Sequence, residues 1–336
     1  MKYKYVYLIA FIGCFLNCAS KKEVHRESVV YKTVTDSIYT RMPGVLLKFG
    51  NYSVWQDPFG VDGFIHVIDT KTNKEIGVMG KIGQGPHEFN TPAIQRGTGN
   101  SILVFDLNSQ KQGIFSIDSL KLDKNYYTPL PKSNNHRVTR KIQLDDNSIL
   151  SLLPGNSMPF VLENNDSSRK EFGVFPINEQ INNGYNIFQG AIGYNKDKKL
   201  LIYSLMNFFS LNIYERSDGN DFTLKNTIMP NINYKITKSE LVLDKNTQIG
   251  PAEMTLTKDY IVTIQRDYEK DNTEESSVGM DFSKNPTTIF LYDYDGNLIK
   301  IVDVGIPLLR IAGEINNNEL FAIGIDNEFV IIAFGI

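Results

Sequence analysis

Short runs of β-branched and aromatic residues recur along the chain, each introduced by a polar turn. Such runs, bounded by turn-forming residues, are typical of β-strands. Six of them share one pattern: Tyr52–Gln56, Ser101–Asp106, Ser148–Leu153, Leu200–Leu205, Tyr260–Gln265 and Leu320–Ile325. Counted from Ile102, the successive intervals to Ile149, Leu200, Ile261 and Leu320 are 47, 51, 61 and 59 residues. A second strand-like run follows each of the six after a few residues.

The segment Pro286–Val304 is the clearest single unit. Thr287–Tyr292 predicts a strand, Asp295-Gly296-Asn297 can supply the positive φ of a tight turn, and Leu298–Val304 predicts the returning strand. A looser copy begins at Leu211. Apolar spacing of three and four residues, which would indicate helices, is nearly absent from the chain.

Several strands per unit, repeated about every 50 residues, predict an all-β fold, a six-bladed β-propeller. A two-sheet sandwich would space its strands evenly, without this longer period. The last unit ends with the chain and lacks an outer strand. Because a propeller has no free sheet edge only when its ring is closed, we expect Val29–Tyr39 to pair with the last blade and to close the ring.

The N-terminus has a different character. Met1–Tyr5 is a short basic leader, Val6–Leu16 is almost entirely apolar, and Cys18 follows. This apolar stretch is too short for a stable transmembrane helix and fits the core of an export signal. We therefore predict a lipoprotein-type signal peptide over residues 1–17, with Cys18 as the acylated N-terminus. Cys14 is the alternative: it has the small residue Gly13 before it, which Cys18 lacks, but a shorter apolar stretch.

Residues 18–28 are predicted to be a polar tether, and residues 29–336 a single propeller domain. Both cysteines lie in or beside the signal segment, so the folded part contains no internal disulfide. The chain has a net charge of −3, which becomes −5 when Lys2 and Lys4 leave with the signal peptide. No block of basic residues remains to attract phosphates, so nucleic acid is excluded as a partner.

The most distinctive local string runs from Gly80 to Phe89, GKIGQGPHEF. No helix can follow it, because Pro92, Gly97 and Gly99 come next, so it is not a nucleotide-binding loop. A related string, Gly-Pro-x-Glu-apolar, comprises Gly250, Pro251, Glu253 and Met254. We interpret Gly85, Pro86, Gly250, Pro251 and Glu253 as a structural motif between blades, in which the glutamate caps free backbone amides. A ligand site at His87 and Glu88 is the second interpretation.

The lipoprotein-like start, the string Gly85-Pro86-His87-Glu88-Phe89 and the repeated units resemble the six-bladed β-propeller lipoproteins of Bacteroides-type bacteria, described as TolB-like or NHL-like. The resemblance covers roughly residues 40–336. It implies a location in the cell envelope, with an outer-membrane anchor, and a binding role. It provides no catalytic residues that could be transferred to this chain.

Motifs for catalysis and metal binding are missing from the sequence. The four histidines, His25, His66, His87 and His136, have no metal-ligand spacing, and there is no Gly-x-Ser-x-Gly nucleophile motif. We therefore assign no catalytic residue, no metal site and no cofactor. Recurrent carboxylates close the second strand-like runs and are interpreted as turn residues that accept backbone hydrogen bonds: Asp69, Asp118, Glu163, Glu215 and Asp293.

The longest irregular segment is Asp267–Asn285. It is either a solvated loop or a functional one, in which Tyr268 and Phe282 could stack on a sugar or a peptide. The sole tryptophan, Trp55, is expected to anchor blade packing. These features favour an envelope-anchored, non-catalytic binding or scaffold protein whose glycan, peptide or protein ligand contacts loops at one end of the propeller channel. The alternatives are a carbohydrate-active enzyme, such as a polysaccharide lyase or hydrolase, and a structural part of a larger envelope complex.

Overall fold

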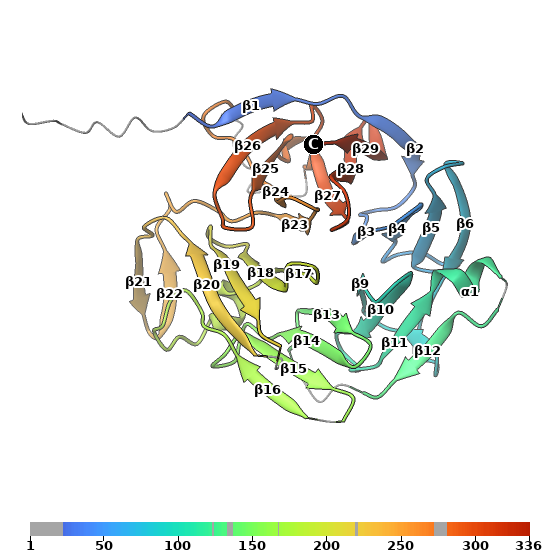
Figure 1. Ribbon diagram of the computed structural model, residues 1–336, viewed down its shortest axis with the longest axis horizontal. Coiled ribbons are helices and arrows are strands. Elements are labelled where there is room, and N and C mark those ends of the chain that lie inside the picture. Colours follow the sequence, from blue (N-terminus) through green and yellow to red (C-terminus); the bar gives the residue numbers. More distant parts are fainter. Residues whose placement is uncertain (1–22, 123, 133–136, 167, 219–220, 272–280) are drawn as a thin grey trace, which may run out of the picture.

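The computed structural model describes residues 23–122, 124–132, 137–166, 168–218, 221–271 and 281–336. The predicted signal peptide, Cys14 and Cys18 lie outside these residues. The described chain forms six radial β-sheets around a central axis (Figure 1). The predicted all-β, six-bladed propeller is therefore confirmed.

The first three blades follow one another along the chain, each with its strands in sequence order from the axis outward. Blade 1 consists of β3 (Leu46–Phe49), β4 (Tyr52–Gln56), β5 (Ile65–Asp69) and β6 (Lys74–Met79). Blade 2 consists of β9 (Pro92–Arg96), β10 (Ser101–Asp106), β11 (Gln112–Ser116) and β12 (Tyr127–Leu130). Blade 3 consists of β13 (Arg140–Asp145), β14 (Ser148–Leu152), β15 (Phe160–Asn164) and β16 (Arg169–Phe172).

The other three blades repeat this order, and two of them recruit strands from the N-terminus. Blade 4 consists of β17 (Gly190–Asn195), β18 (Leu200–Leu205), β19 (Leu211–Arg216) and β20 (Phe222–Ile228). Blade 5 consists of β23 (Glu253–Leu256), β24 (Ile261–Ile264), β25 (Thr288–Tyr292), β26 (Leu298–Asp303) and β1 (His25–Ser28). Blade 6 consists of β27 (Leu308–Gly313), β28 (Glu319–Asp326), β29 (Glu328–Gly335) and β2 (Lys32–Ile38).

Short elements occupy some of the connections. They are α1 (Ile117–Lys121), α2 (Gly184–Ile187), η1 (Phe282–Lys284), the parallel pair β7 (Lys81–Ile82) and β8 (Glu88–Phe89), and the hairpin β21 (Tyr234–Thr237) with β22 (Glu240–Leu243). None of the helices among the described residues is long and apolar enough to cross a membrane.

The regular strand order gives the two ends of the ring different roles. Within each blade neighbouring strands are antiparallel, apart from the parallel pair β1 and β26, and all innermost strands run in the same direction along the axis. Links between blades and links from second to third strands therefore lie at one end. This end, called the loop end below, carries the longest connections: 80–91, 173–189, 229–252 and 265–287. The opposite end carries mainly short turns.

The apolar core is divided among the blade junctions. The described buried residues form six clusters, one between each pair of neighbouring blades. Phe64 of blade 1, for example, packs against Phe115 of blade 2 with ring centroids 6.2 Å apart. Trp55 lies in the cluster between blades 6 and 1, so its predicted packing role is confirmed. The core is thus a ring of interfaces between sheets.

The junction between blades 2 and 3 is the least apolar, with four buried members in its cluster. Lys141 of β13 is inserted here, 2% exposed, and its Nζ donates to Oε1 of Gln112 in β11 at 2.8 Å. Burial lowers the pKa of Lys141 from 10.5 to about 8. A polar contact therefore replaces part of the apolar packing at this junction.

The ring closes where the sequence predicted. β2 pairs antiparallel with β29, so the N-terminal segment supplies the outer strand of the last blade. β1 forms a second pairing that the sequence did not predict. It lies parallel to β26, with His25 opposite Lys300 and Ser28 opposite Asp303. Figure 1 shows this N-terminal segment running along the outside of blades 5 and 6. The predicted tether of residues 18–28 is therefore shorter, because its last four residues form a strand.

The closure can be tested at Ile38, which is 3% exposed in the cluster between blades 6 and 1. We expect Ile38→Ala to lower the free energy of unfolding by about 2–4 kcal/mol, because it leaves a cavity at the closing strand. Urea unfolding followed by the fluorescence of Trp55 measures the change. Val30→Ala is the control: Val30 is 93% exposed beside the same strand, and its effect should stay within about 0.5 kcal/mol. Equal effects of the two variants would contradict a closing role for β2.

Candidate functional site

The string from Gly80 to Phe89 folds into a compact loop at the loop end, between blades 1 and 2. The amide of Glu88 donates to the carbonyl of Gly85 at 3.2 Å, which makes residues 85–88 a tight turn with Pro86 at its second position. Oε2 of Glu88 accepts from the amide of Gly85 at 2.9 Å. A Cβ on Gly83 would lie 2.1 Å from that carboxylate oxygen. The carboxylate of Glu88 is thus used to hold its own loop.

Lys111, which immediately precedes β11 in blade 2, holds the same loop. Its Nζ donates to the carbonyls of Gly85 at 2.7 Å and Glu88 at 2.6 Å, and lies 5.7 Å from the ring centroid of Phe89. Phe89 itself is fully buried between blades 1 and 2. Two of the three ammonium donors are therefore committed to backbone carbonyls, and the loop is pinned to the blade that follows it.

Asp106 joins this loop to the adjacent hairpin of blade 2. One carboxylate oxygen accepts from the amides of Asn90 and Thr91, and the other from the amides of Asn108 and Ser109. The side chain is 3% exposed. Burial acts to raise the pKa of Asp106, but the four amide bonds outweigh it and hold the pKa below its usual value.

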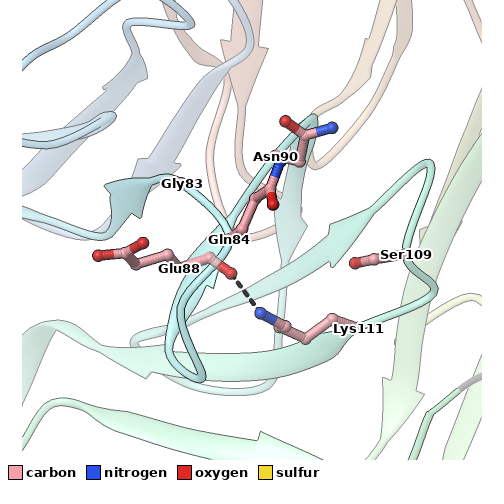
Figure 2. A pocket seen from close by; sticks show the side chains of 6 residues that line it. All are labelled: Gly83, Gln84, Glu88, Asn90, Ser109 and Lys111. Carbon is pink, nitrogen blue, oxygen red and sulfur yellow. Dashed lines mark hydrogen bonds between the residues drawn. The ribbon is translucent and has the colours of Figure 1, made fainter.

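A polar pocket of about 290 Å³ lies beside this loop (Figure 2). Its lining residues come from the loop and from the hairpin of blade 2: Gly83, Gln84, Glu88, Asn90, Ser109 and Lys111. His87 is exposed and packs edge-on against Tyr127, with ring centroids 5.4 Å apart. The pocket therefore offers amides and a hydroxyl to a ligand, while its charged groups already have internal partners.

A second polar group surrounds the axis at the loop end. Arg310 of β27 donates from Nη1 to Oε1 of Glu253 in β23 at 3.0 Å, and from Nε to the carbonyl of Gly44 at 2.8 Å. Arg140 begins β13, on the far side of the ring, and donates from Nη1 to the carbonyl of Thr139. We call Arg140, Glu253 and Arg310 the axial cluster; its members come from blades 3, 5 and 6.

Burial and nearby positive charges act in opposite directions on the pKa of Glu253. Desolvation by the surrounding protein raises the pKa of Glu253, while the positive charges of Arg310 and Arg140 lower it, and the net direction is upward. The side chain keeps 28% of its surface exposed and that of Arg310 keeps 17%. The effect of burial on the pKa of Glu253 is thus larger than the opposite effect of the positive charges, although the guanidinium of Arg310 is in direct contact with the carboxylate.

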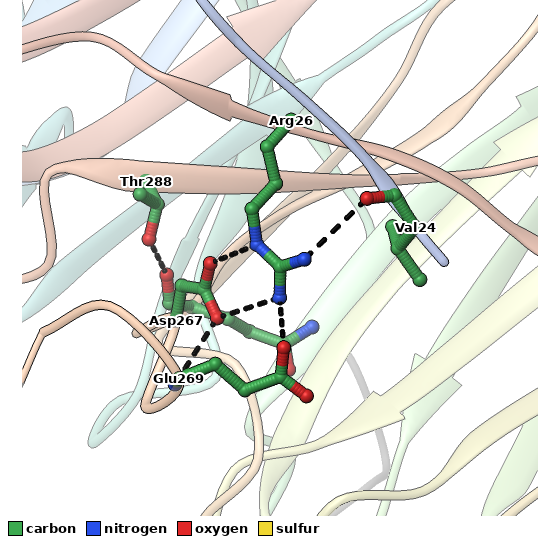
Figure 3. A network of polar contacts seen from close by, with 6 residues as sticks. Val24, Arg26, Asp267, Glu269 and Thr288 are labelled. Carbon is green, nitrogen blue, oxygen red and sulfur yellow. Dashed lines mark hydrogen bonds and ion pairs between the residues drawn. The ribbon is translucent and has the colours of Figure 1, made fainter. Parts of the chain in front are cut away.

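The insertion in blade 5 is tied to the N-terminal strand (Figure 3). Nε and Nη2 of Arg26 in β1 donate to the two carboxylate oxygens of Asp267 at 2.7 and 3.3 Å, and Nη2 also reaches Glu269. Lys300 of β26 pairs with Glu27 at 2.6 Å. Asp267 is 4% exposed. This two-pronged pairing holds the start of the insertion against the strand that joins the propeller to its N-terminus.

Comparison with known families agrees with this architecture. A family model described as "TolB-like 6-blade propeller-like" matches residues 20–306. The chain belongs to the TolB-like six-blade propeller family. A search of curated proteins finds no match to the chain.

Solved structures share the fold of this TolB-like propeller at low sequence identity. A protein of Bacteroides fragilis, named as exported, is 12% identical with a TM-score of 0.56, covering 92% of this chain and 98% of its own. A DUF4221 family member from Bacteroides vulgatus is 11% identical with a TM-score of 0.55, covering 93% and 97%. The Swd1 propeller domain of Myceliophteria thermophila is 12% identical with a TM-score of 0.50, covering 90% and 99%. These similarities show that the proteins share the propeller fold.

The TolB-like propeller does not bring the four predicted binding residues together. His87 and Glu88 lie on the connection between blades 1 and 2, whereas Tyr268 and Phe282 lie on the insertion of blade 5. Tyr268 is 52% exposed, and Phe282 packs edge-on against Phe329 of blade 6 with ring centroids 5.6 Å apart. Both pairs lie at the loop end, at separate positions around the ring.

The second motif differs from its expected role. Gly250 is required by close packing, because a Cβ there would lie 1.9 Å from the carbonyl oxygen of Leu205. Pro251 is buried beside it. Glu253, however, does not cap backbone amides as expected. It is the first residue of an innermost strand and reaches across to Arg310. Because Glu253 comes after the turn at Gly250 and Pro251 and begins β23, it lies at the axis and not in the turn.

The recurrent carboxylates follow the predicted turn role only in part. Asp69 accepts from the amides of Lys71 and Thr72, and Asp293 from those of Asp295 and Asn297. Asp118 instead lies in α1 and accepts from the side chain of Asn100. Glu163 and Glu215 are each the next-to-last residue of a strand, so they are placed too early to cap the turn that follows.

Sequence reasoning missed Arg140, Arg310, Asp106 and Lys111. Arg310 interrupts an otherwise apolar first strand of a blade, and this interruption is the signal that could have marked it, whereas β13 is polar at alternate positions and Arg140 carries no such signal. Within the part of the chain that the structure describes, no three His, Cys, Asp or Glu side chains are grouped to hold a metal ion.

The role of Asp106 leads to a pH-dependent prediction. We expect Asp106→Asn to lower the free energy of unfolding at pH 7 by roughly 2–3 kcal/mol, because the amide group would face backbone N–H donors that need an acceptor. A carboxyl whose pKa is lowered by folding stabilises the protein above its unfolded pKa of about 3.9, and this contribution is lost as the pH falls through the folded value. The difference between wild type and variant should therefore shrink below about pH 4.

Urea titrations at pH 7 and at about pH 3 measure this difference. Asp62→Asn is the control, because Asp62 is exposed. A difference between wild type and Asp106→Asn that stays constant with pH would show that the charge of Asp106 contributes nothing.

Proposed function

We propose that this TolB-like propeller is an exported, envelope-anchored protein that binds its ligand without catalysis at the loop end of the ring. The observation that carries the proposal is the concentration of binding-type features at that end. The longest connections, the polar pocket and the axial cluster all lie there. The opposite end has mainly short turns, which offer little surface for recognition.

Export is supported by two independent features. The first residues have the basic, apolar and cysteine order of a lipoprotein signal. A structural neighbour from Bacteroides fragilis is named as an exported protein. Residues 18–24 would then be the tether between an acylated Cys18 and β1, with the outer membrane as the anchoring membrane.

The enzyme alternative required a base, an acid and a cation gathered at the mouth of the axis. The axial cluster provides an acid, Glu253, and two cations. The described histidines are elsewhere: His25 lies on the outer edge strand, His66 lies between Trp55 and Glu75, and His87 packs on Tyr127. Glu253 is also engaged in an ion pair with Arg310. This arrangement supports recognition of a ligand better than proton transfer.

A structural part of a larger complex would present a broad apolar surface. The exposed large apolar side chains of the described residues are distributed over separate connections and outer strands, with Tyr234, Ile236 and Val242 together on the β21–β22 hairpin. This distribution supports the binding role rather than the structural one.

Binding at the loop end can be tested with arrays of glycans and peptides. We expect the purified protein to capture a ligand class on one of these arrays, and Tyr268→Ala to weaken the capture severalfold, because Tyr268 is 52% exposed at the loop end. Leu122→Ala is the control, since Leu122 is 64% exposed after α1 at the opposite end. The proposal fails if no ligand is captured, or if Leu122→Ala weakens capture and Tyr268→Ala does not.

The anchor is tested by fractionation of cells that express the protein. We expect Cys18→Ala to move the protein from the membrane fraction to the soluble fraction, because the variant has no thiol at residue 18 for acylation. Cys14→Ala is the matched control and should remain in the membrane fraction. The reverse result, with Cys14→Ala soluble and Cys18→Ala membrane-bound, would place the acylated residue at Cys14.

A further inference from the structure

The polar pocket between blades 1 and 2 is lined by side chains of two kinds (Figure 2). Those of Glu88 and Lys111 are used inside the protein, since the first accepts from a backbone amide and the second donates to two backbone carbonyls. Three other lining side chains form no hydrogen bond within the part of the chain that the structure describes: Gln84, Asn90 and Ser109. The pocket thus combines charged groups that are already engaged with neutral polar groups that remain available.

Two segments meet at the pocket, residues 88–91 and 108–111, and most of their polar side chains have internal partners. Nδ2 of Asn108, for example, donates to Oγ1 of Thr91 across the two segments at 2.7 Å. Among the described residues of these segments, the polar side chains without a partner are those that line the pocket, Asn90 and Ser109. Pairing across the segments is therefore geometrically possible, and the groups that face the pocket do not use it.

The loop that carries Gln84 is fixed without a ligand. The amide of Gly83 donates to the carbonyl of Phe89 at 2.9 Å, and β7 pairs with β8 on either side of the tight turn. Lys111 holds the same loop to blade 2. A ligand therefore meets a backbone that is already in place, and binding loses little free energy to the ordering of the loop.

The available groups match hydroxyl groups in their hydrogen bonding. A side-chain amide both donates and accepts, as does a serine hydroxyl, so each can pair with a sugar hydroxyl. The lining includes one carboxylate and one ammonium, both engaged internally, which gives no excess charge to attract an ion. The six lining residues include no apolar side chain. The pocket chemistry therefore favours a neutral ligand rich in hydroxyl groups.

The size of the pocket limits how much of a ligand it can hold. Its volume of about 290 Å³ is close to the lower limit of ligand pockets, about 300 Å³. It therefore suits one small ring and not a long segment of chain. A peptide would also find neither an apolar pocket for a side chain nor a long strand edge here, and these are the features that usually anchor peptides.

We propose that this pocket binds one ring of a neutral saccharide, whose hydroxyl groups pair with Gln84, Asn90 and Ser109. This inference rests on the proposed function, since it names the chemical class that is recognised at the loop end. Tyr268 lies on the insertion of blade 5, at a separate position around the ring. The pocket and the surface around Tyr268 can therefore be tested independently.

The test titrates the purified protein with D-glucose, D-galactose, D-mannose and N-acetyl-D-glucosamine, followed by saturation-transfer NMR. We expect at least one of these sugars to bind saturably. Gln84→Ala and Ser109→Ala should each weaken that binding severalfold, because each removes a hydrogen-bonding group from the lining. Ser109→Phe should abolish it, because the larger side chain fills the pocket. Gln180→Ala is the matched control and should bind as the wild type does, since Gln180 is an exposed amide at the loop end that does not line the pocket.

Three results would overturn the inference: no saturable binding of any of the four sugars, equal affinity of wild type and Ser109→Phe, or equal losses in Gln180→Ala and Gln84→Ala. Circular dichroism and thermal melting establish that each variant is folded. If Ser109→Phe does not fold, Gln84→Phe fills the pocket from the side of the loop instead. Unchanged affinity of that variant would contradict the proposal.

Charged and peptide probes test the class of ligand. D-Glucuronate and D-glucosamine carry opposite charges on a sugar ring, and acetyl-trialanine amide is a neutral peptide. We expect both charged sugars to bind less tightly than the best neutral sugar, and the peptide not to bind. Tighter binding of either charged sugar, or peptide binding that Ser109→Phe abolishes, would overturn the inference. A ligand captured on the arrays through Tyr268 but indifferent to Ser109→Phe would leave the proposed function standing and remove this inference alone.

Discussion

The whole structure depends on the burial of blade faces against one another around a closed ring. Each sheet has two apolar faces, and each face is covered only by the next blade. If the ring opened between blades 6 and 1, the cluster that contains Trp55 and Ile331 would be exposed. The pairing of β2 with β29 prevents this, because it completes the last sheet and joins the first segment of the chain to the last.

Closure also determines where polar groups can gather. Since the innermost strands all run in one direction, their first residues meet at one end of the axis, however far apart they are in the sequence. Glu253 and Arg310 are neighbours for this reason. The faces of the blades are occupied by packing, so accessible charges lie at the axis, on the connections and on the outer strands.

The N-terminal segment contributes both to ring closure and to the arrangement of the loop end. β2 closes the ring, while β1 extends the sheet of blade 5 and places Arg26 against Asp267 at the base of the longest insertion. A segment expected to serve as a tether is thus part of the framework of the loop end. The physical reason is that the edge of β26 exposes unpaired backbone groups, which a passing strand can satisfy even when its side chains are polar.

The sequence by itself determined the repeated strands, the six blades and the closing strand, because the spacing of apolar runs and turns is a local property that survives without tertiary contacts. It also placed Trp55 in the packing and Asp69 and Asp293 in their turns. Only the tertiary structure decided that Glu253 leaves its turn motif for the axis and that Glu88 is occupied by its own loop. These outcomes depend on which blades lie beside or across from one another, and no local pattern records that arrangement.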